Sequence, residues 1–273
     1  MTMILLRDRS NLYGHYVPSQ GAAIFFLIFF GILTLIHVFF IYSRKRKFPI
    51  IIVIGGLFEV IGHASRAYSR HHLSEIVPFS IQIILILLAP ILFAAGIYMF
   101  LGRLIRSSGC PNLSPIRTTW ITKIFLCGDI FCFLVQLAGA SRLIKPKTQK
   151  DVKLGENIIL GGLVLQIIIF LFFVVIAAIF HRRYRRDKQA SESNGLLQQQ
   201  LYTLYVCSGL VLVRSIFRLL EYKTGQNGYL MSHEWPAYTF DVALMAAVMA
   251  ITLNWYRGSL EPDNGGAYSQ ELR

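Results

Sequence analysis

The strongest constraint on the fold of this chain is a series of seven apolar stretches that follow one another along its length. Each stretch is about 20 residues long, which is the length that an α-helix needs to cross a hydrocarbon core of roughly 30 Å. The pattern therefore predicts an all-α polytopic membrane protein, built as a seven-helix bundle. The expected spans are residues 21–42, 49–68, 78–101, 118–140, 157–180, 200–220 and 236–256.

The composition supports a chain that is almost entirely membrane domain. Of its 273 residues, 55% are hydrophobic and only 15% are charged, whereas soluble domains carry about 25% charged residues. We expect a short extracellular N-terminal segment at 1–20, a membrane domain at 21–256 and a disordered cytoplasmic tail at 257–273. The pattern leaves no room for a separate soluble domain.

The basic residues are interpreted as topology signals and not as a nucleic-acid surface. The formal net charge is +13, and Lys and Arg beside membrane spans favour the cytoplasmic side and attract anionic lipids. The Arg-Lys-Arg-Lys run at 44–47, directly after the first span, predicts that the N-terminus is outside and the C-terminus inside. In that orientation the N-x-S/T sequon at Asn112 lies in the cytoplasm and carries no glycan. Membrane lipids are expected partners, and nucleic acids are not.

Charged side chains in and directly beside the last two spans are the first indication of function. Arg214, Arg218 and Glu221 follow one another at spacings of four and three, and Asp241 lies in the next apolar stretch. A charge deep in hydrocarbon costs about 2.5–3.5 kcal/mol on insertion scales, so these groups must pair inside the bundle.

Other spans carry polar residues at helical spacings. In the second span, Glu59 and Arg66 are seven residues apart and share one helix face with His63 between them. In the fourth span Asp129 and Gln136 have the same separation, and the fifth span carries Gln166. The helical rise places Glu59 and Asp129 near the midplane and Lys123 in the cytoplasmic half. The residues expected between the midplane and the outer face are Arg66, Gln136, Gln166, Arg214, Arg218 and Asp241.

Apart from Lys123, which lies near enough to the cytoplasmic end of its span to reach the interface, the charges inside the spans form a neutral set of three acids and three bases. A balanced set favours a paired network over a proton relay or an ion pore, which need unpaired carboxylates or a ring of one sign. The network either locks the helices together or lines a polar cavity that opens toward the outer leaflet and holds an amphipathic molecule by its head group. The six residues are Glu59, Asp129, Asp241, Arg66, Arg214 and Arg218.

Signatures of enzymes and cofactor sites are not found in this sequence. No two histidines are four residues apart, and the four cysteines form no CxxC pattern, so a metal site is not expected. His37 and His63 lie at different depths and fit a haem pair poorly. Neither a P-loop nor a GxSxG motif is present. We expect no catalytic residues, no metal and no cofactor.

An ordered series of motifs resembles the fungal RTA-like family of seven-span proteins, also called the lipid-translocating exporter family. One departure is His63, which stands where the family tends to have an aromatic residue. The matching pieces are Phe58-Glu59 with Gly62 and Arg66; Leu88-Ala89-Pro90, Ala94-Ala95, Tyr98-Met99 and Leu101-Gly102-Arg103; Gly128-Asp129, Gln136 and Gly139; Gly162-Leu163 and Gln166; Arg214 to Arg218 with Glu221; Gly225 and Gly228; His233-Glu234, Tyr238, Phe240-Asp241 and Met245.

The resemblance implies a fungal integral membrane protein, at the plasma membrane, that handles lipids or amphipathic toxicants. Family members are associated with resistance to toxic sterols, with sphingoid-base translocation and with porphyrin or haem movement. Together with the charge pattern, it implies one candidate set for lipid binding or a polar network. The set is Glu59, Arg66, Asp129, Gln136, Gln166, Arg214, Arg218, Glu221, Glu234, Tyr238 and Asp241.

The sequence leaves more than one function open. The first interpretation is a translocator or exporter of amphipathic, sphingoid-base-like or sterol-like molecules that works without an ATPase. The second is a seven-helix receptor-like sensor of lipid or stress. A porphyrin or haem transporter and a membrane hydrolase are weaker alternatives. The ligand, the energy source and the oligomeric state do not follow from the sequence.

Overall fold

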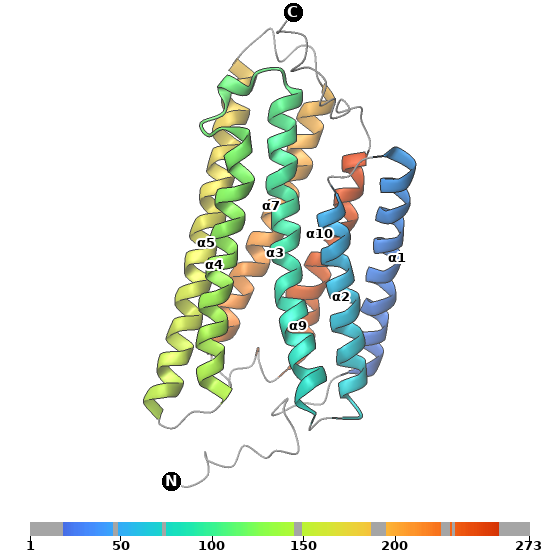
Figure 1. The fold of residues 1–273 in the computed structure, drawn as a ribbon, viewed down its shortest axis with the longest axis vertical. Helices are drawn as coiled ribbons and strands as arrows, with labels where there is room; N and C mark the ends of the chain where they lie inside the picture. Colours follow the sequence, from blue (N-terminus) through green and yellow to red (C-terminus); the bar gives the residue numbers. More distant parts are fainter. Residues whose placement is uncertain are drawn as a thin grey trace, which may run out of the picture.

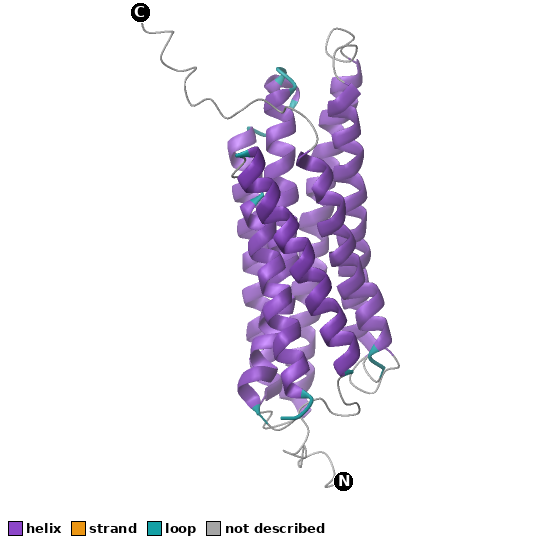
Figure 2. Ribbon diagram, turned by 90° about the vertical axis from the view of Figure 1, so that its right-hand side faces the viewer, coloured by secondary structure: helices purple, strands orange, loops and turns teal. Residues whose placement is uncertain are grey.

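A computed structural model of the chain describes residues 19–45, 49–72, 75–144, 149–186, 195–224 and 233–256, together with Leu230. All regular structure in these segments is helical, and none of it is strand (Figures 1 and 2). The expected C-terminal tail lies outside the described residues. So do all but the last two residues of the expected N-terminal segment.

Seven helices in the described part of the chain are long and apolar enough to cross a membrane, which confirms the predicted all-α bundle. The last of them, Trp235–Tyr256, is composite. It consists of α9 (Trp235–Ala237), the π-helical segment η2 (Tyr238–Val242), α10 (Ala243–Thr252) and the 3-10 turn η3 (Leu253–Tyr256). The other elements are α1 (Gln20–Arg44), α2 (Ile50–Ser69), α3 (Ile76–Ser107), the short 3-10 helix η1 (Pro111–Leu113), α4 (Thr118–Ile144), α5 (Gln149–Arg186) and α7 (Gly195–Thr224).

Three helices run well past the apolar stretches that predicted them. In the structure, α3 extends to Ser107, α5 runs from Gln149 to Arg186, and α7 begins at Gly195. Hydropathy marks only the part of a helix that lies in hydrocarbon, whereas the helix itself continues until its backbone is capped or broken. The extra turns carry polar and basic residues that suit the interfacial region.

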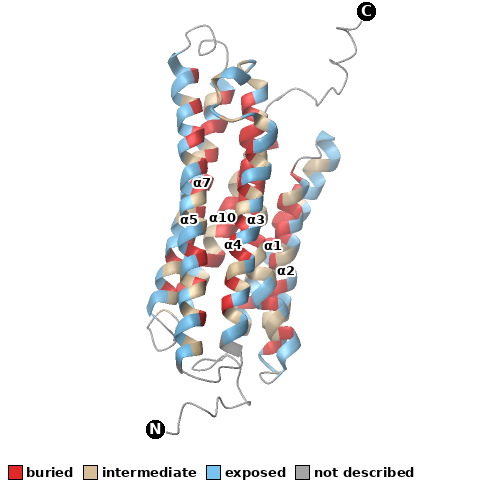
Figure 3. Cartoon of the chain, turned by 60° about the vertical axis from the view of Figure 1, so that its left-hand side comes forward, coloured by how far each residue is buried: buried red, intermediate tan, exposed pale blue. Residues whose placement is uncertain are grey.

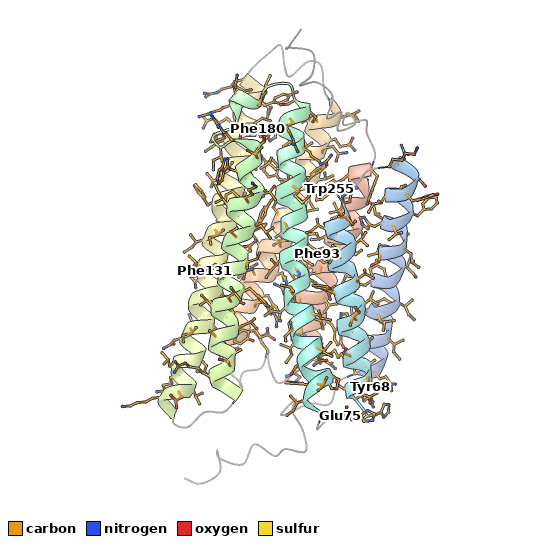
Figure 4. The ribbon with its side chains drawn as sticks, in the orientation of Figure 1. Tyr68, Glu75, Phe93, Phe131, Phe180 and Trp255 are labelled. Atoms are coloured by element: carbon orange, nitrogen blue, oxygen red, sulfur yellow. The ribbon has the colours of Figure 1, made fainter. Side chains whose placement is uncertain are left out.

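The helix α3 occupies the centre of the bundle, where it packs against α2, α4 and α7. On either side of it, α2 also packs against α1, and α4 packs against α5. The buried residues, red in Figure 3, line the faces that the helices turn toward one another. Aromatic rings fill this interior: Phe93 is fully buried, and Phe100 stacks on Trp255 with ring centroids 4.0 Å apart (Figure 4).

The outer surface of the bundle is apolar. Leu35 and Phe131 expose 69% and 58% of their surface, and large hydrophobic side chains on the other spans are similarly exposed. A soluble monomer rarely exposes apolar patches larger than a few hundred Å², whereas a bilayer covers such a surface with acyl chains. Together with the seven spans, this surface is that of a multi-pass integral membrane protein.

Because the number of described spans is odd, the start of the first helix and the end of the last helix lie on opposite sides of the membrane. The first helix, α1, begins at the lower end of the bundle in Figure 1, and η3 ends at the upper end. Asn112 lies in η1, which the chain order places at the same end as η3. The orientation with the N-terminus outside stays a prediction.

Candidate functional site

Four charged side chains from α7 and η2 form an ion-paired group that we call the arginine cluster. Arg214 donates from Nε to Oδ1 of Asp241 at 2.5 Å, and Arg218 donates from Nη1 to Oε2 of Glu221 at 2.8 Å. A second contact joins the two pairs, because Nε of Arg218 lies 3.3 Å from Oδ2 of Asp241. The predicted pairing of α7 with the last span is thus observed.

Local helix geometry explains how these side chains meet. The spacings of four and three put Arg214, Arg218 and Glu221 on one face of α7. Asp241 lies in η2, where Ala243 donates its backbone N–H to the carbonyl of Tyr238, five residues earlier. Such π-turns are frequent at functional sites, because they change the direction in which side chains leave the helix.

A second polar group, the Glu59–His63 pair, lies in α2. Glu59 lies ten residues before the last residue of α2, Ser69, just as Arg214 lies ten residues before the last residue of α7, Thr224. His63 is one turn nearer the end of α2. Oε2 of Glu59 is 3.5 Å from Nε2 of His63, and the two residues are 1% and 0% exposed. Among the described residues, Oε2 of Glu59 and both ring nitrogens of His63 have no hydrogen-bond partner.

Aromatic rings from α1 and the seventh span enclose the imidazole of His63. The rings of Phe26 and Phe30 each have their centroid 5.9 Å from it, and that of Tyr238 is 6.3 Å away. Tyr238 also stacks on Phe26 at 5.4 Å. The arginine cluster is close enough to act electrostatically on this pair: the charges of Arg214 and Asp241 both act on Glu59.

A third group, the end cluster, ties α1, α2 and α9 together near the end of the bundle at which α1 begins. Arg66 donates from Nη2 to Oε1 of Glu234 at 2.6 Å and from Nε to the hydroxyl of Tyr238 at 3.1 Å. The backbone N–H of Ser19 donates to Oε2 of Glu234 at 2.8 Å. The predicted residues Arg66, Glu234 and Tyr238 are therefore in mutual contact.

Asp129 does not join the arginines, contrary to the neutral set of six charges that the sequence suggested. It accepts a hydrogen bond from the hydroxyl of Tyr98 at 2.7 Å, across the contact of α3 with α4. Within the described segments Asp129 has no ion-pair partner, and its Oδ1 accepts no hydrogen bond. The reason is position: α4 packs against α3 and α5, whereas the arginines lie on α2 and α7.

The two predicted glutamines also form a contact of their own. Gln136 of α4 donates from Nε2 to Oε1 of Gln166 of α5 at 2.9 Å. Its side chain lies against Gly162, where a Cβ would come within 2.8 Å of Cγ of Gln136. This hydrogen bond joins α4 to α5, away from the three charged groups on α2, α7 and the seventh span.

The sequence interpretation missed three partners that the structure reveals. His63 was visible four residues after Glu59, and this spacing was the signal that could have added it to the candidate set. Tyr98 carries a hydroxyl inside an apolar span, which needs a partner there. Nothing in the sequence pointed to Phe26. No group of three or more His, Cys, Asp or Glu side chains in the described segments is placed to hold a metal ion.

These features define a polytopic α-helical membrane protein whose buried ion pairs gather toward one end of the bundle. The chain belongs to the RTA1-like family: the family described as RTA1 like protein matches residues 52–263. The resemblance in the motifs is thereby confirmed.

Several relatives from Saccharomyces cerevisiae are similar over most of the chain. Protoporphyrin uptake protein 1 is 30% identical, over 93% of this chain and 95% of the relative. Protein RTM1 is 30% identical over 88% and 91%, and the sphingoid long-chain base transporter RSB1 of strain Lalvin EC1118 is 27% identical over 90% and 73%. No solved structure matches the chain significantly.

Proposed function

We propose that this protein binds an amphipathic molecule within the bundle and translocates it across the membrane, as a lipid or toxicant exporter. The arginine cluster and the Glu59–His63 pair hold the polar head group, and the apolar tail lies along the hydrophobic faces of the helices. We further propose a non-enzymatic role in the plasma membrane of a fungus.

The observation that carries this proposal is the set of buried polar atoms without partners around these two groups. Oε2 of Glu59, both ring nitrogens of His63 and Nη2 of Arg214 are buried and make no hydrogen bond to the described residues. Each buried group left unsatisfied costs about 1–3 kcal/mol. A polar head group that bonds to several of them at once recovers this free energy.

The names of two relatives support the same class of cargo. One is a sphingoid long-chain base transporter and another a protoporphyrin uptake protein. A sphingoid base and a porphyrin both combine a large apolar body with charged groups. Protoporphyrin is therefore our second candidate cargo, favoured by the relative that is 30% identical over nearly the whole chain.

A reconstitution experiment tests the proposal. Purified protein in liposomes is expected to move a fluorescent single-chain lipid between leaflets, and Arg214→Ala and Glu59→Ala should abolish this movement. Gln200→Ala is the matched control, because Gln200 is a buried polar residue of α7 that bonds to the carbonyl of Asn254 at the opposite end of the bundle.

Three outcomes separate the candidates. Saturable binding without movement identifies the receptor-like sensor, and release of a modified product identifies a hydrolase. Competition by protoporphyrin identifies the porphyrin transporter. The proposal fails if both variants stay folded, as judged by a monodisperse elution profile, and still bind and move the lipid as the unmodified protein does.

A further inference from the structure

The connection between α3 and α4 carries a sequence pattern that the proposed function does not use. Of the nine prolines in the chain, only Pro115 directly follows a serine or a threonine. The connection reads Ser-Pro-Ile-Arg from Ser114 to Arg117. Proline has no backbone N–H, so a kinase pocket that selects it leaves no buried donor unpaired. A basic residue at the third position after the serine is a charge pattern by which such kinases recognise their substrates.

The backbone at Ser114 has the extended conformation in which a kinase binds its substrate. Ser114 follows the 3-10 helix η1 with φ −77° and ψ 133°, which is the region that a following proline favours. The serine is half-buried, and both Pro115 and Arg117 are exposed. Its hydroxyl donates to the carbonyl of Ile116 at 2.7 Å, a contact within the connection itself.

This connection lies beyond the hydrocarbon of the membrane. The helix α3 ends at Ser107, roughly 9 Å past residue 101, where its apolar stretch ends. In Figure 1 the connection is at the upper end of the bundle, and η1 there contacts the end of α5. In the predicted orientation this end faces the cytoplasm, which holds ATP and protein kinases.

The end of α5 brings an arginine to the serine. Arg183 donates from Nη1 to the carbonyl of Leu113, the residue before Ser114, at 3.3 Å. Its side chain is exposed. This bond uses one of the five N–H donors of a guanidinium, so Arg183 is placed to donate to a second acceptor beside Leu113 as well.

The charges at this end of the bundle favour an anion. Every Asp and Glu in the described segments lies near the middle of the bundle or toward the end at which α1 begins, and Asp129 is the acid of α4. The described residues around η1 include Arg106, Arg117 and Arg183. A cluster of one sign without acids attracts an anionic group.

We propose that Ser114 is a phosphorylation site for a proline-directed serine kinase, and that Arg183 and Arg117 hold the phosphate. This modification is independent of which cargo the bundle carries. The γ-phosphoryl group of ATP passes to Oγ of Ser114, and the bond from its phosphorus to the bridging oxygen of ADP breaks. The proton of the hydroxyl goes to the aspartate base of the kinase.

The phosphate changes which elements the connection is bonded to. Phosphoserine carries a charge of about −1.5 to −2 at pH 7. Oγ of Ser114 loses its proton, and with it the bond to the carbonyl of Ile116. In exchange the phosphate accepts charge-assisted hydrogen bonds from Arg183 of α5 and from Arg117. Phosphorylation therefore ties the connection between α3 and α4 to the end of α5.

Treatment with a kinase tests the site directly. The full chain in phosphatidylcholine nanodiscs, incubated with a cyclin-dependent kinase and ATP, should gain one phosphate at Ser114, as read by peptide mass spectrometry. Ser114→Ala and Pro115→Ala should each prevent this gain. Ser108→Ala is the matched control, because Ser108 is a half-buried serine of the same connection whose hydroxyl also donates to a backbone carbonyl, that of Ile105.

Thermal unfolding tests the arginine. Phosphorylation should raise the unfolding temperature of the unmodified protein, and Arg183→Gln should accept the phosphate but lose this rise. Arg142→Gln is the control, because it makes the same change at an exposed arginine near the opposite end of α4. An equal rise in Arg183→Gln overturns the role of Arg183.

The full chain isolated from yeast cells that express it should carry the same phosphate at Ser114. Absence of the phosphate there, or after kinase treatment, overturns the site, and so does a gain of phosphate that persists in Ser114→Ala. A glycan at Asn112 also overturns it, because the connection would then face away from the cytoplasm. None of these results changes the lipid-movement assay, which tests the proposed function separately.

Discussion

At the scale of single residues, the ion pair of Arg214 with Asp241 illustrates why these charges depend on one another. Both side chains are buried, at 6% and 5% exposure. Two opposite charges in such a place roughly offset their loss of hydration, but one charge alone does not. Removing one partner is therefore more damaging than removing both.

A double-mutant comparison tests this dependence. Arg214→Met should destabilise the protein by about 3–5 kcal/mol, because Asp241 keeps only the more distant Arg218. Arg214→Met combined with Asp241→Leu should recover part of that loss, since Arg218 still pairs with Glu221. The measurement is thermal unfolding of the purified protein in detergent. Equal unfolding temperatures for the single and double variants would contradict the pairing.

The hydrogen bond from Tyr98 to Asp129 leads to a second prediction at this scale. Tyr98→Phe removes the donor and leaves the buried carboxyl of Asp129 without the partner it has in the structure, so we expect a loss of about 1–3 kcal/mol. The control is Tyr42→Phe, because Tyr42 is 85% exposed. The two variants should differ clearly in unfolding temperature, and similar values would argue against this hydrogen bond.

At the scale of elements, α4 and α5 approach closely because glycines line their contact. A Cβ added at Gly139 would lie 2.9 Å from the backbone carbonyl oxygen of Gly155 and 2.7 Å from Cγ1 of Ile159. Small residues allow membrane helices to pack backbone against backbone, which increases their van der Waals contact. The bond between Gln136 and Gln166 joins the same two helices.

A pair of glycine variants tests this contact. Gly139→Ala should destabilise the bundle by about 1–3 kcal/mol, because the backbone of α5 cannot move aside as a flexible side chain can. Gly161→Ala, in α5, should be neutral or slightly stabilising, because no atom lies within 4 Å of the added Cβ. Unfolding in a denaturant series compares the two, and equal stability would mean that α4 and α5 are not in close contact at Gly139.

At the scale of the whole molecule, the basic residues predict which end of the bundle lies on which side of the membrane. With the N-terminus outside, η1 faces the cytoplasm and the start of α5 faces outward. Cys110, directly before η1, and Lys150, near the start of α5, mark these two ends.

Labelling of intact cells tests the orientation. A membrane-impermeant maleimide should leave Cys110 of the unmodified protein unlabelled until the cells are permeabilised. The variant Cys110→Ser/Lys150→Cys should be labelled without permeabilisation. A glycan at Asn112 or the reverse labelling pattern would place the N-terminus inside.

Much of the fold was predictable because its signals are local. Seven apolar stretches each specify one helix, since hydrocarbon requires every backbone group of a span to be bonded within that span. The candidate residues were also visible, because a charged side chain in an apolar span stands out wherever its partner is. Motifs in chain order indicated the family before any contact was known.

The pairing of the polar residues is what only the tertiary structure decided. Which side chains meet depends on how each helix is rotated and which helices are its neighbours, and neither is encoded in the hydropathy of a single span. The packing of α4 between α3 and α5 gave Asp129 the hydroxyl of Tyr98 in place of an arginine. Arg66 pairs with Glu234, Arg214 with Asp241 and Arg218 with Glu221, and the partner of Glu59 is His63. The sequence thus determined that the buried charges need polar partners inside the bundle, and the packing of the helices determined which side chains those partners are.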